Sequence, residues 1–191
     1  MFPLKGYTGK WLSVDLNSGH VQTRPLDPAL VEGYLGGNGF GTRMLWEQVG
    51  LEVDPLCPDN LLIFATGPLC GTALPTSGRL AVIAKSPLTG VYGDSNAGGS
   101  LGPEITFAGW DYIVFSGRAP NPVYLLIQDD HVELRDASQL WGLTTSRTEE
   151  AIQNELGDRK IRTATIGSAG ENMVRYAGIQ VTSGRSAARC G

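Results

Sequence analysis

The 191-residue sequence has little cysteine, no long apolar run and no excess of positive charge. Its three cysteines, Cys57, Cys70 and Cys190, are an odd number and lie far apart. No C-x-x-C pair occurs, so cysteine spacing indicates neither a zinc site nor a local iron–sulfur cluster. We expect reduced thiols, as in a cytoplasmic protein.

Other missing features exclude further classes of protein. No apolar run approaches the ~20 residues of a membrane-spanning helix, and the N-terminus lacks the apolar core and cleavage site of a secretory signal. The net charge of −4 provides no basic field that would attract nucleic acid or an anionic membrane. We therefore expect no nucleic acid and no membrane among the partners, and a cytoplasmic location.

Glycine, in contrast, is abundant. The 26 glycines are about twice the usual share, which predicts many turns and close approaches of the backbone. Hydrophobic residues make up 41% and charged residues 18%, as in a globular chain. The length suits one domain, or two small halves that share a core.

The pattern of apolar residues and turns predicts an α+β chain that is rich in strands. Hairpins are expected around 17–19 and 129–130, and short apolar runs predict buried strands. The expected strands are 11–16, 20–24, 61–65, 80–84, 112–115, 123–127, 132–135 and 162–166. The expected helices are 28–34, 42–49 and 148–156, and 167–171 is expected to be a turn.

The glycines between the first two helices do not form a dinucleotide-binding fingerprint. They follow a helix rather than a strand, and the segment 36–41 does not have the G-x-G-x-x-G spacing. Two interpretations stay open: contact with a cofactor, or a plain helix end followed by a second helix.

The two parts of the chain, about 1–118 and 119–191, resemble each other in the order of their elements. Each has a hairpin, a helix, an apolar strand, a glycine-rich turn, a further strand and a loop with arginine and small residues. We infer a duplicated α+β unit of two similar halves. The alternative is chance, because a hairpin followed by a helix is common.

The stretch from Leu74 to Gly99 is the part of the sequence on which the prediction of a binding site is based. Turn clusters at 75–78, 86–90 and 93–99 surround one apolar run, which predicts a buried strand with two ligand-facing loops. Arg79 and Lys85 would lie at the two ends of the strand, and Asn96 in the second loop. The alternatives are an ordinary connection and, for Lys85, a surface side chain whose stem packs on the protein.

The motifs PTSGR, KSPLTG and SNAGG, in this order and spacing, resemble the aldehyde:ferredoxin oxidoreductase family of tungstopterin enzymes. The resemblance runs from GYTGKWLSVDL to GRSAARCG and corresponds to the N-terminal domain of such an enzyme. It implies the fold of that domain, described as two similar α+β halves, over the whole of 1–191. The family's later, cluster-binding domains are absent from this sequence.

The resemblance implies a cofactor in which two molybdopterin-type pterins hold one tungsten, with a bridging Mg²⁺. The four pterin sulfurs ligate the tungsten, so the protein has to neutralise phosphates and to supply oxygen ligands for Mg²⁺. Arginine suits phosphate because its planar guanidinium donates two hydrogen bonds at once. Mg²⁺ is a hard cation that prefers oxygen.

The resemblance also implies which positions contact the cofactor. They are Arg79, Asn96, Gly98, Arg185, Ser186, Ala188 and Arg189. Mg²⁺ would be ligated by the side chain of Asn96 and the backbone carbonyl of Ser186. The chain departs from the family where Ser186 replaces a usual alanine, Ala188 a usual glycine and Cys190 often a glycine. No catalytic residue is assigned.

Four of these residues have a simpler interpretation. Arg79 could pair with a surface carboxylate, and Asn96 could cap a turn. Arg185 and Arg189 could belong to a solvated tail.

For the full-length enzyme, the resemblance implies oxidation of an aldehyde to a carboxylate, with electrons passing through a 4Fe-4S cluster to ferredoxin. We expect the fragment alone to be inactive, because the cluster ligands and proton-transfer residues belong to later domains. The alternatives are the same scaffold in an aromatic acyl-CoA reductase subunit and a non-catalytic pterin-binding module. The sequence leaves open whether the protein forms a homo-oligomer or binds a partner subunit.

Overall fold

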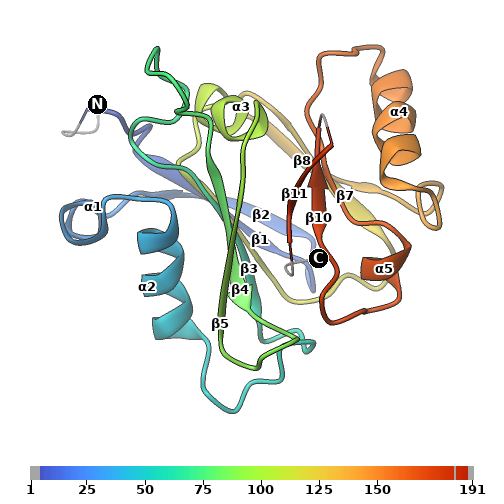
Figure 1. Ribbon diagram of the computed structural model, residues 1–191, viewed down its shortest axis with the longest axis horizontal. Coiled ribbons are helices and arrows are strands. Elements are labelled where there is room, and N and C mark those ends of the chain that lie inside the picture. The colour runs from blue at the N-terminus through green and yellow to red at the C-terminus, as the bar shows by residue number, and fades with distance from the viewer. Residues whose placement is uncertain (1–4, 183, 189–191) are drawn as a thin grey trace.

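The structure contains two groups of strands, each with helices beside them (Figure 1). It is a computed structural model that describes residues 5–182 and 184–188. The strands of the first group are β1 (Lys10–Asp15), β2 (His20–Pro25), β3 (Leu61–Ala65), β4 (Leu80–Lys85), β5 (Tyr92–Ala97) and β6 (Tyr112–Ser116). Its helices are α1 (Pro28–Tyr34), α2 (Asn38–Gln48) and α3 (Leu101–Phe107). The second group contains β7 (Val123–Gln128), β8 (His131–Asp136), α4 (Thr145–Leu156), β9 (Ala164–Thr165), α5 (Ser168–Glu171), β10 (Ile179–Val181) and β11 (Arg185–Ala187).

The first group forms one six-stranded sheet in the order β2-β1-β6-β3-β4-β5. β6 runs parallel to β1 and antiparallel to β3, and the other neighbours are antiparallel. The three apolar runs of this half of the chain became β3, β4 and β6, the central strands, which are buried on both faces for most of their length.

The two faces of this sheet bury two separate cores. On one face, α2 packs Phe40 and Met44 against Ile63 and Ile83. Gly41 permits this contact, since a Cβ there would lie 2.6 Å from Cδ1 of Ile83. The other face packs its apolar side chains against residues of the second group of strands.

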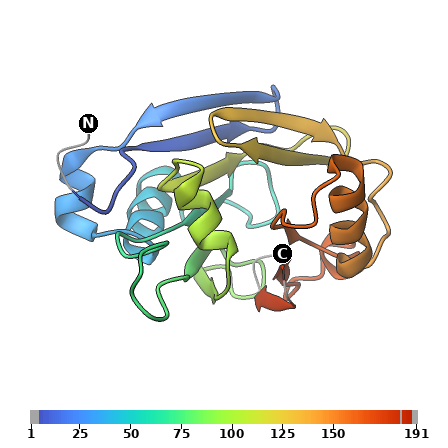
Figure 2. The ribbon, with the colours of Figure 1, turned by 90° about the horizontal axis from the view of Figure 1, so that it is seen from above.

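The second group lies against that inner face. It forms two small sheets, β7-β8 and β11-β10-β9. Figure 2 shows the β1–β2 and β7–β8 hairpins side by side, and β2 contacts β8 there. β5 contacts β11 at the other end of the first sheet. The strands therefore surround a common interior.

Most of the expected elements are present, and the α+β class is confirmed. Both hairpins form, and α1 begins as predicted, with Asp27 accepting a hydrogen bond from the backbone N–H of Ala29. The sheet orders agree with the inferred duplication, which stays a prediction. Among the described residues, no helix is long and apolar enough to cross a membrane.

Two expectations about the central stretch were wrong. Asn96 does not lie in a loop, because Tyr92–Ala97 pairs along its whole length with β4 to form β5. Lys85 does not lie on the surface: it is buried, and its Nζ donates hydrogen bonds to the carbonyl oxygens of Gly50 and Leu51 at 3.2 and 2.5 Å. These two acceptors offset the cost of burying the amine.

Several boundaries also differ from the prediction. α2 begins at Asn38 rather than at 42, α3 was not predicted, and 168–171 is a short helix rather than a turn. The strand expected at 162–166 is reduced to Ala164–Thr165. α3 contains a glycine and a proline in its first turn, where proline is tolerated because its missing N–H would have no partner in the helix.

Candidate functional site

One end of the β4–β5 pair brings three of the predicted residues together. Leu80 is the pairing partner of Ala97. Arg79, just before β4, therefore lies across from Gly98, just after β5, and Asn96 lies two residues before Gly98 along β5. The predicted residues of the first half thus converge at one edge of the sheet.

The backbone stays in close contact beyond the last pair of this ladder. A Cβ on Gly78 would lie 2.4 Å from the carbonyl oxygen of Gly99, so the two backbone segments touch and leave no room for a side chain at Gly78. The buried Cys70 thiol contacts the carbonyl oxygen of Arg79 at 3.6 Å. Burial raises the pKa of the Cys70 thiol, which therefore acts as a neutral support for the backbone of Arg79.

A hollow of about 240 Å³ opens beside Arg79 and Asn96. Its other walls come from the segment between α1 and α2 and from the residues after β3, and they include Gly36, Gly37, Asn38, Gly67 and Pro68. The hollow lies on the face of the sheet that α2 covers, because Ala81, the pairing partner of Asn96, belongs to the core on that face.

Bare backbone forms one wall of this hollow. Gly36 and Gly37 have positive φ angles of 147° and 53°, which favour glycine. The N–H of Gly37 donates to the carbonyl oxygen of Thr66 at 2.7 Å, and a Cβ on Gly36 would lie 3.0 Å from that oxygen. The glycine-rich segment therefore serves both as a turn between two helices and as a wall of the hollow.

Asn38 is a candidate that the sequence did not single out. Its Nδ2 donates to the carboxylate of Asp94 on β5 at 2.7 Å, which fixes the orientation of the amide. Its Oδ1 is buried and has no hydrogen-bond partner among the described residues. Only its position between glycines could have marked this residue in the sequence.

Arg185 reaches the same place from the second group of strands. Its Nη1 lies 3.0 Å from the position that a Cβ of Gly98 would take, and its Cδ lies 3.3 Å from the corresponding position at Gly99. Arg185 is not among the residues that line the 240 Å³ hollow. The two arginines therefore adjoin Gly98 from different sides, one from β4 and one from β11.

The remaining predicted residues lie close to Arg185 in the chain. Ser186 and Ala188 are exposed, whereas Ala187 is fully buried in the interior core, as Ala97 is on β5. Since side chains alternate along a strand, Asn96 and Ser186 each lie on the side of their strand opposite to a buried alanine. Arg189 and Cys190 lie outside the described residues.

Arg79 and Arg185 bring two positive charges to this edge, and Asp94, which is hydrogen-bonded to Asn38, brings one carboxylate. Arg79 and Arg185 are exposed, and neither forms an ion pair in the part of the chain that the structure describes. The surface ion pair that was the alternative for Arg79 is thus not seen. Within residues 5–182 and 184–188, no group of three or more His, Cys, Asp or Glu side chains could hold a metal ion. The arrangement suits an anionic ligand.

The fold and this edge define a strand-rich α+β domain with two exposed arginines at one end of a strand pair, and comparison with known proteins defines the family. The family model described as aldehyde ferredoxin oxidoreductase, N-terminal domain, matches residues 11–191. The chain belongs to this family, as its motifs predicted.

Named relatives show the range of the family. The tungsten-containing aldehyde ferredoxin oxidoreductase of Pyrococcus abyssi is 48% identical over 97% of this chain and 31% of its own length. An aliphatic sulfonate oxidoreductase, WOR-like subunit, of Pyrococcus furiosus is 36% identical over 91% of this chain and 30% of that protein. These relatives are oxidoreductases, and the chain spans about a third of their length.

A solved structure is also similar along the whole chain. It is the active site complex BamBC of benzoyl coenzyme A reductase with 1,5-dienoyl-CoA. The TM-score is 0.95 at 44% identity, over 98% of this chain and 28% of that chain.

Proposed function

We propose that this chain is the cofactor-holding N-terminal domain of a tungsten bis-pterin aldehyde:ferredoxin oxidoreductase. The convergence of Arg79, Asn96, Gly98 and Arg185 at one end of β5 is the observation that carries the proposal. The 48% identity to a tungsten-containing aldehyde ferredoxin oxidoreductase, over 97% of the chain, supports the choice of cofactor.

The residues at this edge fit such a group. Glycine backbone lets a flat ligand approach closely, and Arg79 and Arg185 leave two guanidinium groups without a carboxylate partner in the described part of the chain. The buried Oδ1 of Asn38 is an acceptor without a donor among the described residues. A pterin carries phosphate, which needs cations, and N–H groups, which need acceptors.

Each residue then has a role in holding the cofactor. Arg79, Arg185 and Arg189 would neutralise and orient the phosphates. Gly98 and Ala188 would leave room for the pterin beside the backbone. The side chain of Asn96 and the carbonyl of Ser186 would supply oxygen ligands to Mg²⁺. When bound, the cofactor supplies the metal centre at which an aldehyde is oxidised to a carboxylate.

The rest of the reaction belongs to the full-length enzyme. We propose that it carries a 4Fe-4S cluster, passes electrons to ferredoxin and acts in the cytoplasm, and that residues 1–191 alone are inactive. The division of this chain into halves at about 118 is part of the same proposal.

A second candidate function is a subunit of an aromatic acyl-CoA reductase. The TM-score of 0.95 to the BamBC complex favours it, since the identity of 44% is close to that of the aldehyde-oxidising relative. Activity assays on the full-length protein distinguish the two: aldehyde-dependent reduction of a viologen dye supports the first, and reduction of an aromatic acyl-CoA supports the second. Bound pterin without either activity would support the third candidate function, a non-catalytic pterin-binding module.

The proposal is tested by Arg79→Ala in the full-length protein. A charge-assisted hydrogen bond to phosphate contributes about 1.5–3 kcal/mol, so we expect cofactor retention about tenfold weaker or worse. Tungsten analysis and pterin fluorescence per polypeptide measure it, and circular dichroism checks the fold. Arg159→Ala, at another exposed arginine, is the matched control. Unchanged tungsten and pterin content in the Arg79 variant would remove this residue from the site.

A further inference from the structure

The residues just before β1 contact two of the segments that wall the 240 Å³ hollow beside Arg79. Gly6 lies against the carbonyl oxygen of Pro68, since a Cβ on Gly6 would come within 2.7 Å of it. The hydroxyl of Tyr7 donates a hydrogen bond to the carbonyl oxygen of Leu35 at 2.5 Å. Pro68 and Leu35 both line the hollow, so the N-terminal segment supports two of its walls.

Leu35 has a backbone conformation that is uncommon for leucine. Its φ is 59° and its ψ is −46°, and its side chain is 70% exposed, so burial of the side chain does not hold it there. Residues keep such angles only where the surrounding contacts enforce them. Tyr7, 28 residues earlier in the chain, fixes the Leu35 carbonyl from outside α1.

The orientation of the Leu35 carbonyl sets the path of the wall that follows it. Leu35 shares a peptide plane with Gly36, and Gly36 and Gly37 have positive φ angles. Glycine has many accessible conformations, so these two residues do not fix their own path. A Cβ on Gly36 would lie 3.1 Å from Cα of Gly67, so two walls of the hollow touch here. A rotation of the Leu35 peptide would therefore change the shape of the hollow.

Asp111 anchors this arrangement by two routes. Its buried carboxylate accepts hydrogen bonds from the N–H groups of Thr8 and Gly9, which fixes the N-terminal segment. Its backbone carbonyl accepts from the N–H and the hydroxyl of Thr66 at 3.0 and 2.8 Å. The carbonyl of Thr66 accepts in turn from the N–H of Gly37 at 2.7 Å. Both routes therefore lead from one buried residue to the glycine-rich wall.

We propose that Tyr7 is a positioning residue of the cofactor site, whose hydroxyl holds the wall Leu35–Asn38 in the shape that the ligand of Arg79 requires. Tyr7 is not among the residues that line the hollow, so it acts through Leu35. This inference rests on the function proposed above and adds to it a role for the segment before β1.

Tyr7→Phe in the full-length protein removes this hydroxyl alone. The ring can keep its place beside Phe40, where the two ring centroids are 6.3 Å apart. In protein produced without tungsten, we expect amide exchange of the peptide 36–39 to become about fivefold faster, the factor for one lost hydrogen bond. In protein produced with tungsten, we expect tungsten and pterin retention to be weaker by a factor of about two to five.

Tyr124→Phe is the matched control. It also removes one tyrosine hydroxyl, which donates to Glu155 at 2.8 Å, and Tyr124 does not line the 240 Å³ hollow. This variant should keep the exchange rate of 36–39 and the full content of tungsten and pterin. Equal loss of cofactor in the two variants would overturn the inference, because the role of Tyr7 would then be merely structural.

Two further outcomes for Tyr7→Phe would overturn the inference. One is an unchanged exchange rate of 36–39, and the other is faster exchange with unchanged tungsten and pterin. Either result leaves the proposed function standing if Arg79→Ala lowers the cofactor content. Unchanged cofactor content in Arg79→Ala would instead count against the proposed function, whereas the exchange of 36–39 in tungsten-free protein reports on Tyr7 and Leu35 alone.

Discussion

Gly98 lies where the two halves of the candidate site meet, and its lack of a side chain leaves room for Arg185. A Cβ on Gly98 would lie 3.0 Å from Nη1 of the Arg185 guanidinium. Gly98→Ala should displace this flexible side chain and leave the fold intact, with a change in unfolding free energy within about 0.5 kcal/mol. We expect less tungsten and pterin per polypeptide in the full-length protein, as measured by metal analysis and fluorescence.

Gly33→Ala is the control for this prediction. Gly33 lies in α1 and is not among the residues that line the hollow, and a Cβ there would meet nothing within 4 Å. Alanine in a helix is better than glycine by up to about 1 kcal/mol, so this variant should be slightly more stable with full cofactor content. Equal cofactor content in the two variants would contradict the role proposed for Gly98.

Asp111 is a buried carboxylate that is 3% exposed and precedes β6. It accepts hydrogen bonds from the backbone N–H groups of Thr8 and Gly9 at 2.9 and 2.8 Å. Burial outweighs these hydrogen bonds and raises the pKa of Asp111 above its ordinary value of 3.8. The folded chain therefore binds this proton more tightly than the unfolded chain does.

The stability that Asp111 contributes should therefore depend on pH. The contribution is fully present below pH 3.8 and is lost as the pH rises through the raised pKa of the folded state. Asp111→Asn has no such proton. The difference in unfolding free energy, wild type minus variant, should therefore shrink as the pH rises from 3.8. Urea unfolding of both proteins over a series of pH values measures this, and a difference that grows with pH would contradict it.

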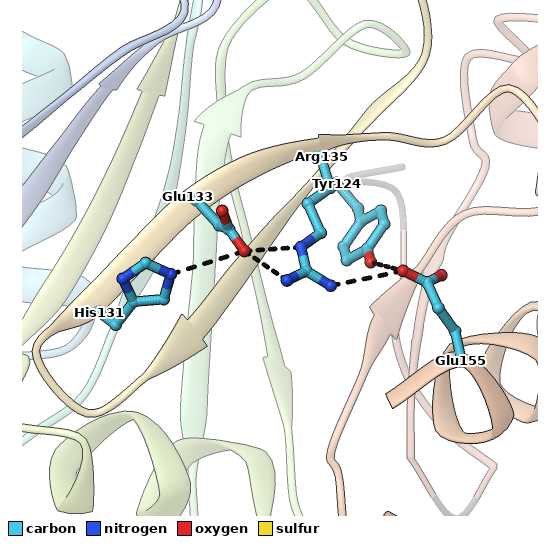
Figure 3. A network of polar contacts seen from close by, with 5 residues as sticks. All are labelled: Tyr124, His131, Glu133, Arg135 and Glu155. Carbon is cyan, nitrogen blue, oxygen red and sulfur yellow. Dashed lines mark hydrogen bonds and ion pairs between the residues drawn. The ribbon is translucent and has the colours of Figure 1, made fainter. Parts of the chain in front are cut away.

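At the scale of elements, α4 contacts the β7–β8 hairpin through the polar network of Figure 3. Glu155 accepts hydrogen bonds from the hydroxyl of Tyr124 at 2.8 Å and from Arg135 at 3.4 Å. Arg135 also donates to Glu133 at 2.6 Å, and His131 lies 3.6 Å from the same carboxylate. The hydrogen bond from Arg135 lowers the pKa of Glu133.

The apolar side of α4 should contribute more stability than this network. Ile152 is 7% exposed, so Ile152→Ala should cost about 2–5 kcal/mol of unfolding free energy. Glu155→Gln should change stability little, because the charged side chains are partly exposed and screened by salt. Denaturant unfolding at low and high salt checks both variants. A larger loss for Glu155→Gln would show that the polar contacts hold the helix.

How much could be predicted differs from element to element. The hairpins, α1 and the apolar central strands follow from periodicity and turn residues, which act locally. β5 could not be predicted, because Gly93, Asp94 and Asn96 are poor strand formers and become a strand by pairing with β4. α3 was missed because its glycine and proline are typical of turns.

At the scale of the whole molecule, the sequence indicated candidate residues for the site but not how they meet. Arg79 and Asn96 lie near each other because β4 and β5 pair in one register. The contact of Arg185 with Gly98 depends on the packing of two sheets, which no local pattern encodes. Asn38 was missed because its orphan oxygen arises from a tertiary hydrogen bond to Asp94.

The contact between β5 and β11 has a consequence for the cohesion of the domain. The two strands belong to different sheets, and no backbone ladder joins them in the described part of the chain. A ligand bound by both Arg79 and Arg185 would act as a cross-link between the sheet that contains β5 and the sheet that contains β11. Its binding free energy would oppose separation of these two sheets. Empty protein should therefore be cleaved by proteases sooner along this junction than loaded protein.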